Sequence, residues 1–142
     1  MAIVAAVDRS ARAADAVEEA ERLAEAFDDP VHVVHVLTRS EFVDMGRTAA
    51  EEVGGSISMD EVKAAARAVA AEAAADLTVP TEAVGLVGDP ADAILEYADE
   101  HDARYVVVAG RRRSPTGKAV FGSVTQSVLL NADCPVVTSI EQ

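Results

Sequence analysis

The chain has 142 residues, half of them hydrophobic, and its 25 acidic residues against 12 basic ones give a formal net charge of −13. This length and apolar content suit one domain with a complete hydrophobic core. The acidity disfavours general nucleic-acid binding, which needs a basic surface. The longest apolar runs, such as 2–7, are far shorter than the roughly 20 residues of a membrane-spanning helix.

The composition also predicts the type of organism and the cellular compartment in which the protein occurs. Lys63 and Lys118 are the only lysines, and the other ten cations are arginines. Many acids, few lysines and few aromatic residues are typical of extreme halophiles, whose dense carboxylates keep a protein hydrated in molar salt. An acidic protein from a GC-rich genome is the alternative. The lone cysteine, Cys134, and the absence of a basic leader before the first strand favour a cytoplasmic protein.

The first half of the chain alternates between strand and helix patterns. A strand is predicted over 2–7, a helix over 9–27 and a second strand over 31–37. A polar, glycine-containing loop is predicted next, followed by a helix over 60–76. The apolar stripes expected to face the core are Ala13, Val17, Ala20, Ala24 and Phe27 in the first helix and Val62, Ala66, Val69 and Ala73 in the second.

The second half continues the alternation. A strand over 81–88 precedes a helix over 89–101, for which Asp89 is the predicted N-cap and Pro90 the first residue. A strand over 104–110, a helix over 122–132 and a last strand over 135–140 complete the chain. Strands that alternate with helices and are apolar throughout predict a parallel sheet covered on both faces. The predicted fold is therefore a single-domain, doubly wound, Rossmann-like α/β fold with five parallel strands.

Two strand orders are realistic for such a sheet, 3-2-1-4-5 and 2-1-3-4-5. Ligands bind where the order reverses, outside the carboxyl ends of the strands. The first order brings Asp8, after strand one, beside Gly110, after strand four; the second favours the loop after strand three. The glycines and cations that follow strand four favour the order 3-2-1-4-5.

The segment 110–123, GRRRSPTGKAVFGS, concentrates positive charge in an acidic chain. Gly122 and Ser123 directly precede a helix pattern, and free N–H groups at a helix N-terminus form an anion site that glycine leaves accessible. The arginines 111–113 and Lys118 add charged donors. The segment matches neither a Walker A loop nor a GxGxxG fingerprint. The alternative is a surface loop whose arginines pair with the acidic surface.

Four stretches resemble universal stress proteins, and together they cover nearly the whole chain: VAAVDRSARAADAVEEA, VHVVHV, GLVGDPADAILEYADEHDARYVVVAG and FGSVTQSVLLNADCPVVTS. Nucleotide-binding members of that family show a glycine, two residues, a second glycine, nine residues, and then Gly-Ser or Gly-Thr. Gly110, Gly122 and Ser123 match the outer parts of this pattern. Arg113 stands at the second glycine, and the final spacing is one residue short.

The resemblance implies the order 3-2-1-4-5, as in the adenine nucleotide α-hydrolase-like folds, and ATP as the ligand, with or without Mg²⁺. The residue matching Asp8 is implied to contact the nucleoside, and the one matching Val36 to frame adenine with its backbone. The structural alternatives are an N-cap of helix 9–27 for Asp8 and a core position for Val36. The implied nucleotide-binding positions are Asp8, Val36, Gly110, Gly122, Ser123 and Val124, with Ala6 and Val7 as lesser wall positions. Arg113, at the second glycine, is included in the predicted site. Ser114, Gly117 and Lys118 supply a rearranged phosphate cradle unless ATP binding has been lost.

Other reactive residues have structural interpretations. His32 and His35 are three apart on one strand and therefore point to opposite faces of the sheet, so they cannot share a metal, and no metal site is predicted. Cys134 is interpreted as a packed residue at a strand start. No Ser-His-Asp grouping or carboxylate pair can be placed, so no catalytic residue is predicted and at most weak ATP hydrolysis is expected.

Three functions therefore compete. The favoured one is an adenine-nucleotide-binding stress-response or regulatory protein that changes state or partner with ATP. The second is a dimeric interaction module that binds no nucleotide, and the third is a hydrolase, for which a dedicated general base is lacking. The last strand, PVVTSI, has no charge to block pairing at a sheet edge. Because the resemblance implies dimerisation through this strand, a homodimer is predicted.

Overall fold

The computed structural model describes residues 1–112 and 119–141. The elements within these ranges are β1 Ala2–Ala6, α1 Arg12–Phe27, β2 Val31–Leu37, α2 Arg39–Val53, α3 Met59–Ala73, β3 Thr81–Val87, α4 Pro90–Glu100, β4 Ala103–Arg112, β5 Ala119–Val120, α5 Ser123–Asn131 and β6 Val136–Glu141. Strands and helices alternate as the apolar patterns predict. Helix α2 and the two-residue strand β5 are additions that the sequence analysis did not contain.

The sheet has the predicted strand order. β1 pairs in parallel with β2 and β4, β2 pairs with β3, and β4 pairs with β6. The parallel strands thus lie in the order β3-β2-β1-β4-β6, which is 3-2-1-4-5 when β6 is counted as the fifth parallel strand. β5 adds a short antiparallel pairing at the far end of β4. The order reverses between β1 and β4, so the crevice lies where the sequence predicted it.

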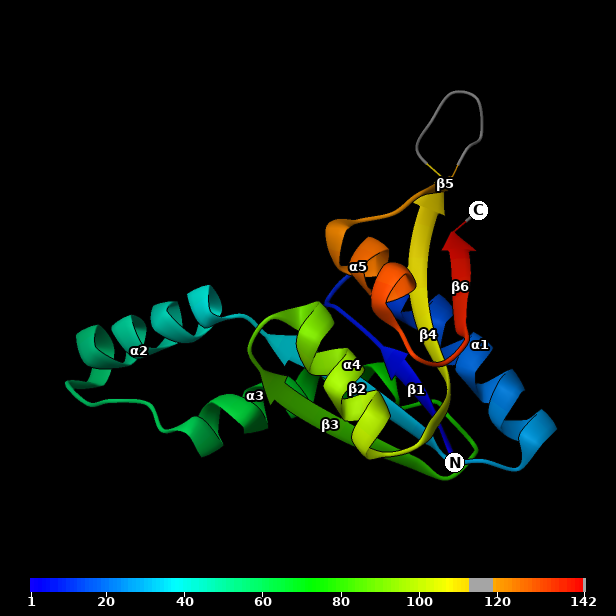
Figure 1. The fold of residues 1–142 in the computed structure, drawn as a ribbon. Helices are drawn as coiled ribbons and strands as arrows, with labels where there is room; N and C mark the ends of the chain where they lie inside the picture. Colours follow the sequence, from blue (N-terminus) through cyan, green and yellow to red (C-terminus); the bar gives the residue numbers. More distant parts are fainter. Residues whose placement is uncertain (113–118, 142) are drawn as a thin grey trace.

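Helices cover both faces of this sheet (Figure 1). On one face α1 and α3 pack against Ile3, Ala5 and Val33. On the other face α4 and α5, drawn in front of the strands in Figure 1, pack against Val4 and Val106. Because both faces are covered, the central strands are apolar at every position instead of alternating. In the part of the chain that is described, no helix is both long and apolar enough to cross a membrane.

Two of the predicted helix stripes need correction at their ends. Phe27, predicted to be buried, is 41% exposed. It stands in the last turn of α1, where its ring packs against Tyr105 and lies 4.5 Å below the guanidinium of Arg104. In α3 the fully buried stripe ends at Ala70, and Val69 and Ala73 are only half-buried. The buried residues Val62, Ala66 and Ala70 are four residues apart, and the positions on this spacing are the ones that face the sheet.

Helix α2 occupies a segment that was predicted to be a polar loop. Thr38 Oγ1 accepts a hydrogen bond from the Glu41 amide at 3.2 Å, and the Glu41 carboxylate accepts one from the Thr38 amide at 3.3 Å. This reciprocal capping box starts the helix, and Gly54, with a φ of 67°, ends it. None of residues 39–52 is fully buried, and Figure 1 shows α2 projecting away from the sheet. A helix that buries so little side-chain surface has no clear apolar stripe. The polar pattern of this segment therefore predicted a loop instead of a helix.

Candidate nucleotide-binding site

A cavity opens at the carboxyl ends of the central strands. β1 leaves the sheet after Ala6, whereas β2 and β4 on either side of it continue to Leu37 and Arg112. The resulting space has a volume of about 380 Å³, which is within the usual range of small-molecule sites. The predicted site residues that line it are Ala6, Val7, Asp8, Val36, Gly110, Gly122, Ser123 and Val124. Arg113, Ser114, Gly117 and Lys118 lie outside the described residues.

The peptide groups of Val36 face this cavity. The β1–β2 register ends at Ala6 and Val34, and the Val7 amide makes the last bond, to Val34 O at 2.9 Å. Leu37 O accepts from Gly88 on the other side, so the odd-numbered residues of β2 turn their peptide groups toward β3. In a parallel sheet the intervening residues then turn theirs toward β1. The N–H and C=O of Val36 therefore lie beyond the end of β1, although its side chain is a core residue.

Asp8 supplies a carboxylate on the β1 side of the cavity. It is not the N-cap of α1 as the structural alternative had it, because the helix starts later and Ala11 holds the cap position. Asp8 Oδ1 accepts from the Ser10 amide at 2.8 Å and from the Ser10 hydroxyl. Its Oδ2 lies 3.8 Å from Arg12 Nη2. One carboxylate oxygen is thus used by the local turn, and the other stands beside a cation at the cavity wall.

The N-terminus of α5 forms the wall of the cavity on the β4 side. Gly122 is the N-cap, and the amides of Ser123, Val124 and Thr125 are the first of the helix. Such amides have no partner within their own helix and carry the positive end of its dipole. A methyl group added at Gly122 would meet no atom within 4 Å, so the approach is open. Thr125 is buried, and its hydroxyl donates to Ala109 O at 3.2 Å, which ties the helix to β4.

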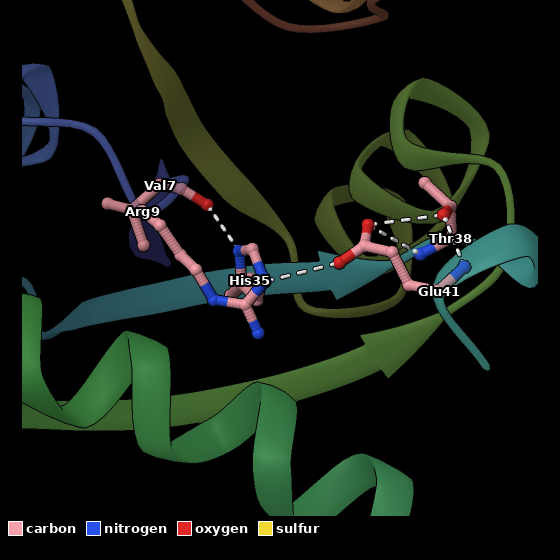
Figure 2. Close-up of polar contacts among 5 residues, drawn as sticks. All are labelled: Val7, Arg9, His35, Thr38 and Glu41. Atoms are coloured by element: carbon pink, nitrogen blue, oxygen red, sulfur yellow. Dashed lines mark hydrogen bonds and ion pairs between the residues drawn. The ribbon is translucent and has the colours of Figure 1, made fainter. Parts of the chain in front are cut away.

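Thr38 and Glu41 form the rim on the β2 side, and the sequence analysis did not include them. Glu41 uses one carboxylate oxygen for its capping box, and its other oxygen pairs with Arg9 Nη1 at 3.3 Å, as Figure 2 shows. The signal was present in the sequence, since Thr-x-x-Glu is a helix-start pattern. Arg12 and His35, which also line the cavity, carry no comparable sequence pattern.

A second polar cluster lies at the opposite, amino end of the sheet. The Tyr97 hydroxyl is 2.7 Å from His32 Nδ1, and His101 stacks on Tyr97 with ring centroids 3.8 Å apart. Burial, and secondarily Glu82, raises the pKa of Tyr97 to about 12, so its phenol keeps its proton and donates to His32. Burial is also the main reason that the pKa of His32 is lowered. These polar groups satisfy one another, which makes the cluster a structural one.

Comparison with known proteins identifies the family. The family model described as "Universal stress protein family" matches residues 1–139. The chain belongs to the universal stress protein family. This agrees with the resemblance found along the sequence and with the strand order of the sheet.

Several relatives within the family are similar over nearly the whole chain. A universal stress protein of Methanocaldococcus jannaschii is 28% identical over 95% of this chain and 79% of its own length. The structure of a universal stress protein from Archaeoglobus fulgidus is 36% identical, with a TM-score of 0.66 and 97% of each chain covered. A structure of the Archaeoglobus fulgidus universal stress protein in complex with dAMP is 29% identical, has a TM-score of 0.66, and covers 97% of this chain and 96% of that one.

Proposed function

We propose that this universal stress protein binds an adenine nucleotide in the cavity at the carboxyl ends of β1, β2 and β4. The observation that carries the proposal is the pairing of two features at opposite sides of one cavity. The peptide groups of Val36, which make no backbone bond toward β1 among the described residues, lie on the β2 side, and the N-terminus of α5 lies on the β4 side. Two strand spacings of about 4.8 Å separate β2 from β4. An elongated ligand with a hydrogen-bonding base at one end and an anion at the other suits this arrangement.

The Val36 peptide groups favour adenine over guanine. An N–H and a C=O side by side complement a ligand edge that presents one acceptor and one donor. The Watson–Crick edge of adenine presents the N1 lone pair and the N6 amine, which is this pattern. Guanine presents an N1–H and the O6 oxygen at the corresponding positions, so its donor and acceptor are exchanged. Leaving two polar groups unpaired in a closed site is costly, and the same edge would therefore discriminate against GMP.

The ribose and the phosphate of a nucleotide also have complementary protein groups in the cavity. Asp8 Oδ2, beside Arg12, is available to accept from ribose hydroxyls. The amides that follow Gly122 suit a phosphate, because a helix N-terminus attracts anions and glycine permits a close approach. The dAMP complex of the Archaeoglobus fulgidus relative supports an adenine mononucleotide. We propose ATP, with Mg²⁺, as the physiological ligand, with the rest of the phosphate chain reaching Arg113, Ser114, Gly117 and Lys118.

The biological role that follows is regulatory. We propose that residues 1–142 form one cytoplasmic universal stress protein domain that changes state or partner when the nucleotide binds. A dimeric module that has lost nucleotide binding is the alternative, favoured by Arg113, which stands at the second glycine of the family's nucleotide-binding pattern.

Direct ligand detection separates these two functions. Protein purified natively in molar KCl would be analysed by mass spectrometry for released nucleotides and titrated calorimetrically with AMP, GMP and ATP–Mg²⁺. We expect AMP and ATP to bind and GMP to bind more weakly by at least about tenfold. Equal affinity for AMP and GMP would contradict the role of Val36, and the absence of any adenine-nucleotide binding would leave the interaction module.

We further propose that the protein is a homodimer joined through β6. β6 pairs with β4 on one side, and no other described strand covers its second side. Because Pro135 O accepts from the Val106 amide, Val136, Thr138 and Ile140 turn their peptide groups toward the open side. Thr138→Pro removes one outward N–H and leaves the bonds to β4 intact.

Sedimentation in molar KCl tests the dimer. The wild-type protein is expected to sediment as a dimer and Thr138→Pro as a folded monomer, with Thr138→Val as the control that keeps the N–H. Val137 is a less suitable position, because it packs against the core on the α1 face. A wild-type monomer would refute the proposal, as would a Thr138→Pro dimer of undiminished stability.

A further inference from the structure

We infer that His35 is a positioning residue for the nucleotide site, because it holds the peptide that carries Asp8. This inference rests on the proposed function for its binding consequence, although the contact itself is independent of any ligand. His35 Nδ1 lies 2.8 Å from the Val7 carbonyl oxygen, as Figure 2 shows. The carbonyl belongs to the peptide bond between Val7 and Asp8. Its orientation therefore determines where the chain, and with it the Asp8 carboxylate, goes after leaving the sheet.

Val7 directly follows β1 and is the last residue whose amide bonds to β2. Its amide donates to Val34 O at 2.9 Å, which is the end of the regular ladder. Its carbonyl oxygen then accepts a hydrogen bond from the side chain of His35 instead of from a backbone amide. Both peptide groups of Val7 are thus fixed to β2, one through the backbone and one through an imidazole. The turn at Asp8 and Ser10 starts directly from this anchored residue.

The imidazole is well suited to serve as an anchor. Only 6% of His35 is exposed, and it projects from a strand whose neighbouring residues are buried. A carbonyl oxygen only accepts, so Nδ1 carries a hydrogen and is the donor of this bond. Nε2 is buried and has no hydrogen-bond partner among residues 1–112 and 119–141.

The unpaired nitrogen indicates what the residue contributes. A buried polar nitrogen without a hydrogen-bond partner is destabilising, whereas an apolar side chain of similar size would avoid this cost. A histidine used only for packing would therefore be an unfavourable choice at this position. What an apolar residue cannot supply is the hydrogen bond from Nδ1 to Val7 O. That bond is made to Val7, which lines the cavity next to Asp8, and this position connects it to the site.

A second contact ties the same loop to the β2 side, but it is weaker. Arg9 pairs with Glu41, and their side chains are 61% and 39% exposed. Exposed pairs of this kind contribute little, and molar salt screens them further. The buried hydrogen bond from His35 is not affected in this way. Of the two side-chain contacts from this loop to the β2 side, the His35 hydrogen bond is therefore the one that high salt leaves intact.

Calorimetric titration with AMP tests the inference through three variants of His35. His35→Leu removes the donor and is expected to weaken AMP binding about tenfold, the size of one lost hydrogen bond. His35→Asn places an amide nitrogen where Nδ1 stands and is expected to restore most of the affinity. His35→Gln places its amide one bond farther away and is expected to bind as weakly as His35→Leu. If the leucine variant does not fold, the comparison of asparagine with glutamine remains decisive.

A matched control is available in the same chain. His101 Nδ1 makes the same kind of bond, to Tyr97 O at 2.9 Å, but at the amino end of the sheet. His101→Leu should lower stability without changing AMP affinity. A double-mutant cycle with Asp8→Ala adds a readout that a purely structural role would not move. If His35 acts through Asp8, the double variant should bind about as weakly as Asp8→Ala alone, instead of losing a further tenfold.

Ligand-free NMR separates this inference from the proposed function. The amide resonances of Asp8, Arg9 and Ser10 should shift in His35→Leu and return in His35→Asn, whether or not a nucleotide binds. Unchanged resonances in His35→Leu would overturn the positioning role. Additive losses of affinity in the double-mutant cycle, or equal affinities of the asparagine and glutamine variants, would also overturn it. Wild-type protein that binds no AMP, together with the expected shifts, would overturn the proposed function alone.

Discussion

The two ends of the parallel sheet differ in whether their polar groups are hydrogen-bonded within the fold. At the amino end Arg104 Nε bonds to Asp29 Oδ2 at 2.6 Å, and the Tyr97 hydroxyl bonds to His32. At the carboxyl end, within residues 1–112 and 119–141, the peptide groups of Val36 lie beyond the last bond between β1 and β2, and the first amides of α5 have no partner within their own helix. The difference arises because β1 stops early, while β2 and β4 continue on both sides of it.

This contrast separates stability from binding. Polar groups whose hydrogen bonds are all made within the fold stabilise it and have none left for a ligand. Polar groups that the fold leaves open are available to a ligand that completes their hydrogen bonds. Variants at the carboxyl end should therefore change affinity, and variants at the amino end should change stability. The following predictions test this division, from the largest expected effect to the smallest.

The largest effect is expected for Gly122→Asp at the carboxyl end. A carboxylate at the N-cap of α5 would occupy the space next to the free amides and repel a phosphate. Such like-charge contacts cost several kcal/mol, so AMP affinity should fall by more than about a hundredfold. Because no atom lies within 4 Å of an added methyl group, the melting temperature should change little. Gly122→Ala is the control for backbone effects, and undiminished binding by Gly122→Asp would refute the site.

At the amino end, Asp29→Ala is expected to cause the largest loss of stability. It removes the hydrogen-bonded ion pair that joins the start of β2 to the start of β4, and the Asp29 side chain is only 8% exposed. Thermal unfolding should show a clear drop in melting temperature, with AMP affinity unchanged. Glu18→Ala breaks an exposed pair with Arg22 and serves as the control. A weaker effect of Asp29→Ala than of Glu18→Ala would contradict the prediction.

Tyr97→Phe should have a smaller effect at the same end. The ring stays in the core, and only the 2.7 Å hydrogen bond to His32 is lost. The free energy of unfolding should fall by about 1 kcal/mol, the usual contribution of such a bond, as measured by urea denaturation. Tyr105→Phe, at a ring for which no hydroxyl bond is described, is the matched control. A change in the AMP affinity of Tyr97→Phe would contradict the assignment of stability to the amino end and of binding to the carboxyl end.

The smallest expected effect is a pH dependence from His32. Burial lowers the pKa of His32, so the folded state favours the neutral ring more than the unfolded state does. Its contribution to stability is therefore complete above the ordinary histidine pKa of about 6.5 and is lost as the pH falls through the lowered value. Glu82 and His101 oppose each other in setting that value.

Melting curves between pH 5 and 8 measure this dependence (about the range in which histidine titrates). His32→Gln should flatten the acid limb relative to the wild type. Asp8→Asn, at the other end of the sheet, should leave that limb unchanged. Identical acid limbs for the wild type and His32→Gln would show that other groups cause the loss.

The sequence predicted well wherever a segment is buried on a regular repeat. β2 was predicted with its observed bounds, and Asp89 and Pro90 start α4 as expected. Prediction failed for α2, because that helix buries so little that local capping by Thr38 and Glu41 defines it instead of an apolar stripe. It also placed the start of α1 too early, since the local turn of Asp8 and Ser10 delays the helix.

The amino-acid sequence by itself determined the alternation of strands and helices, the strand order through its family resemblance, and eight positions that share one cavity. The resemblance implied a backbone role for Val36, and only the tertiary structure gives its physical reason, because the direction of its peptide groups matters only where β1 ends before β2 does. The role of His35 is of the same kind: the residue with which it pairs, Val7, is 28 positions away in the chain. Periodicity reports which side chains are buried, whereas unpaired peptide groups arise from the relative lengths of neighbouring strands, and these are set by contacts between distant segments.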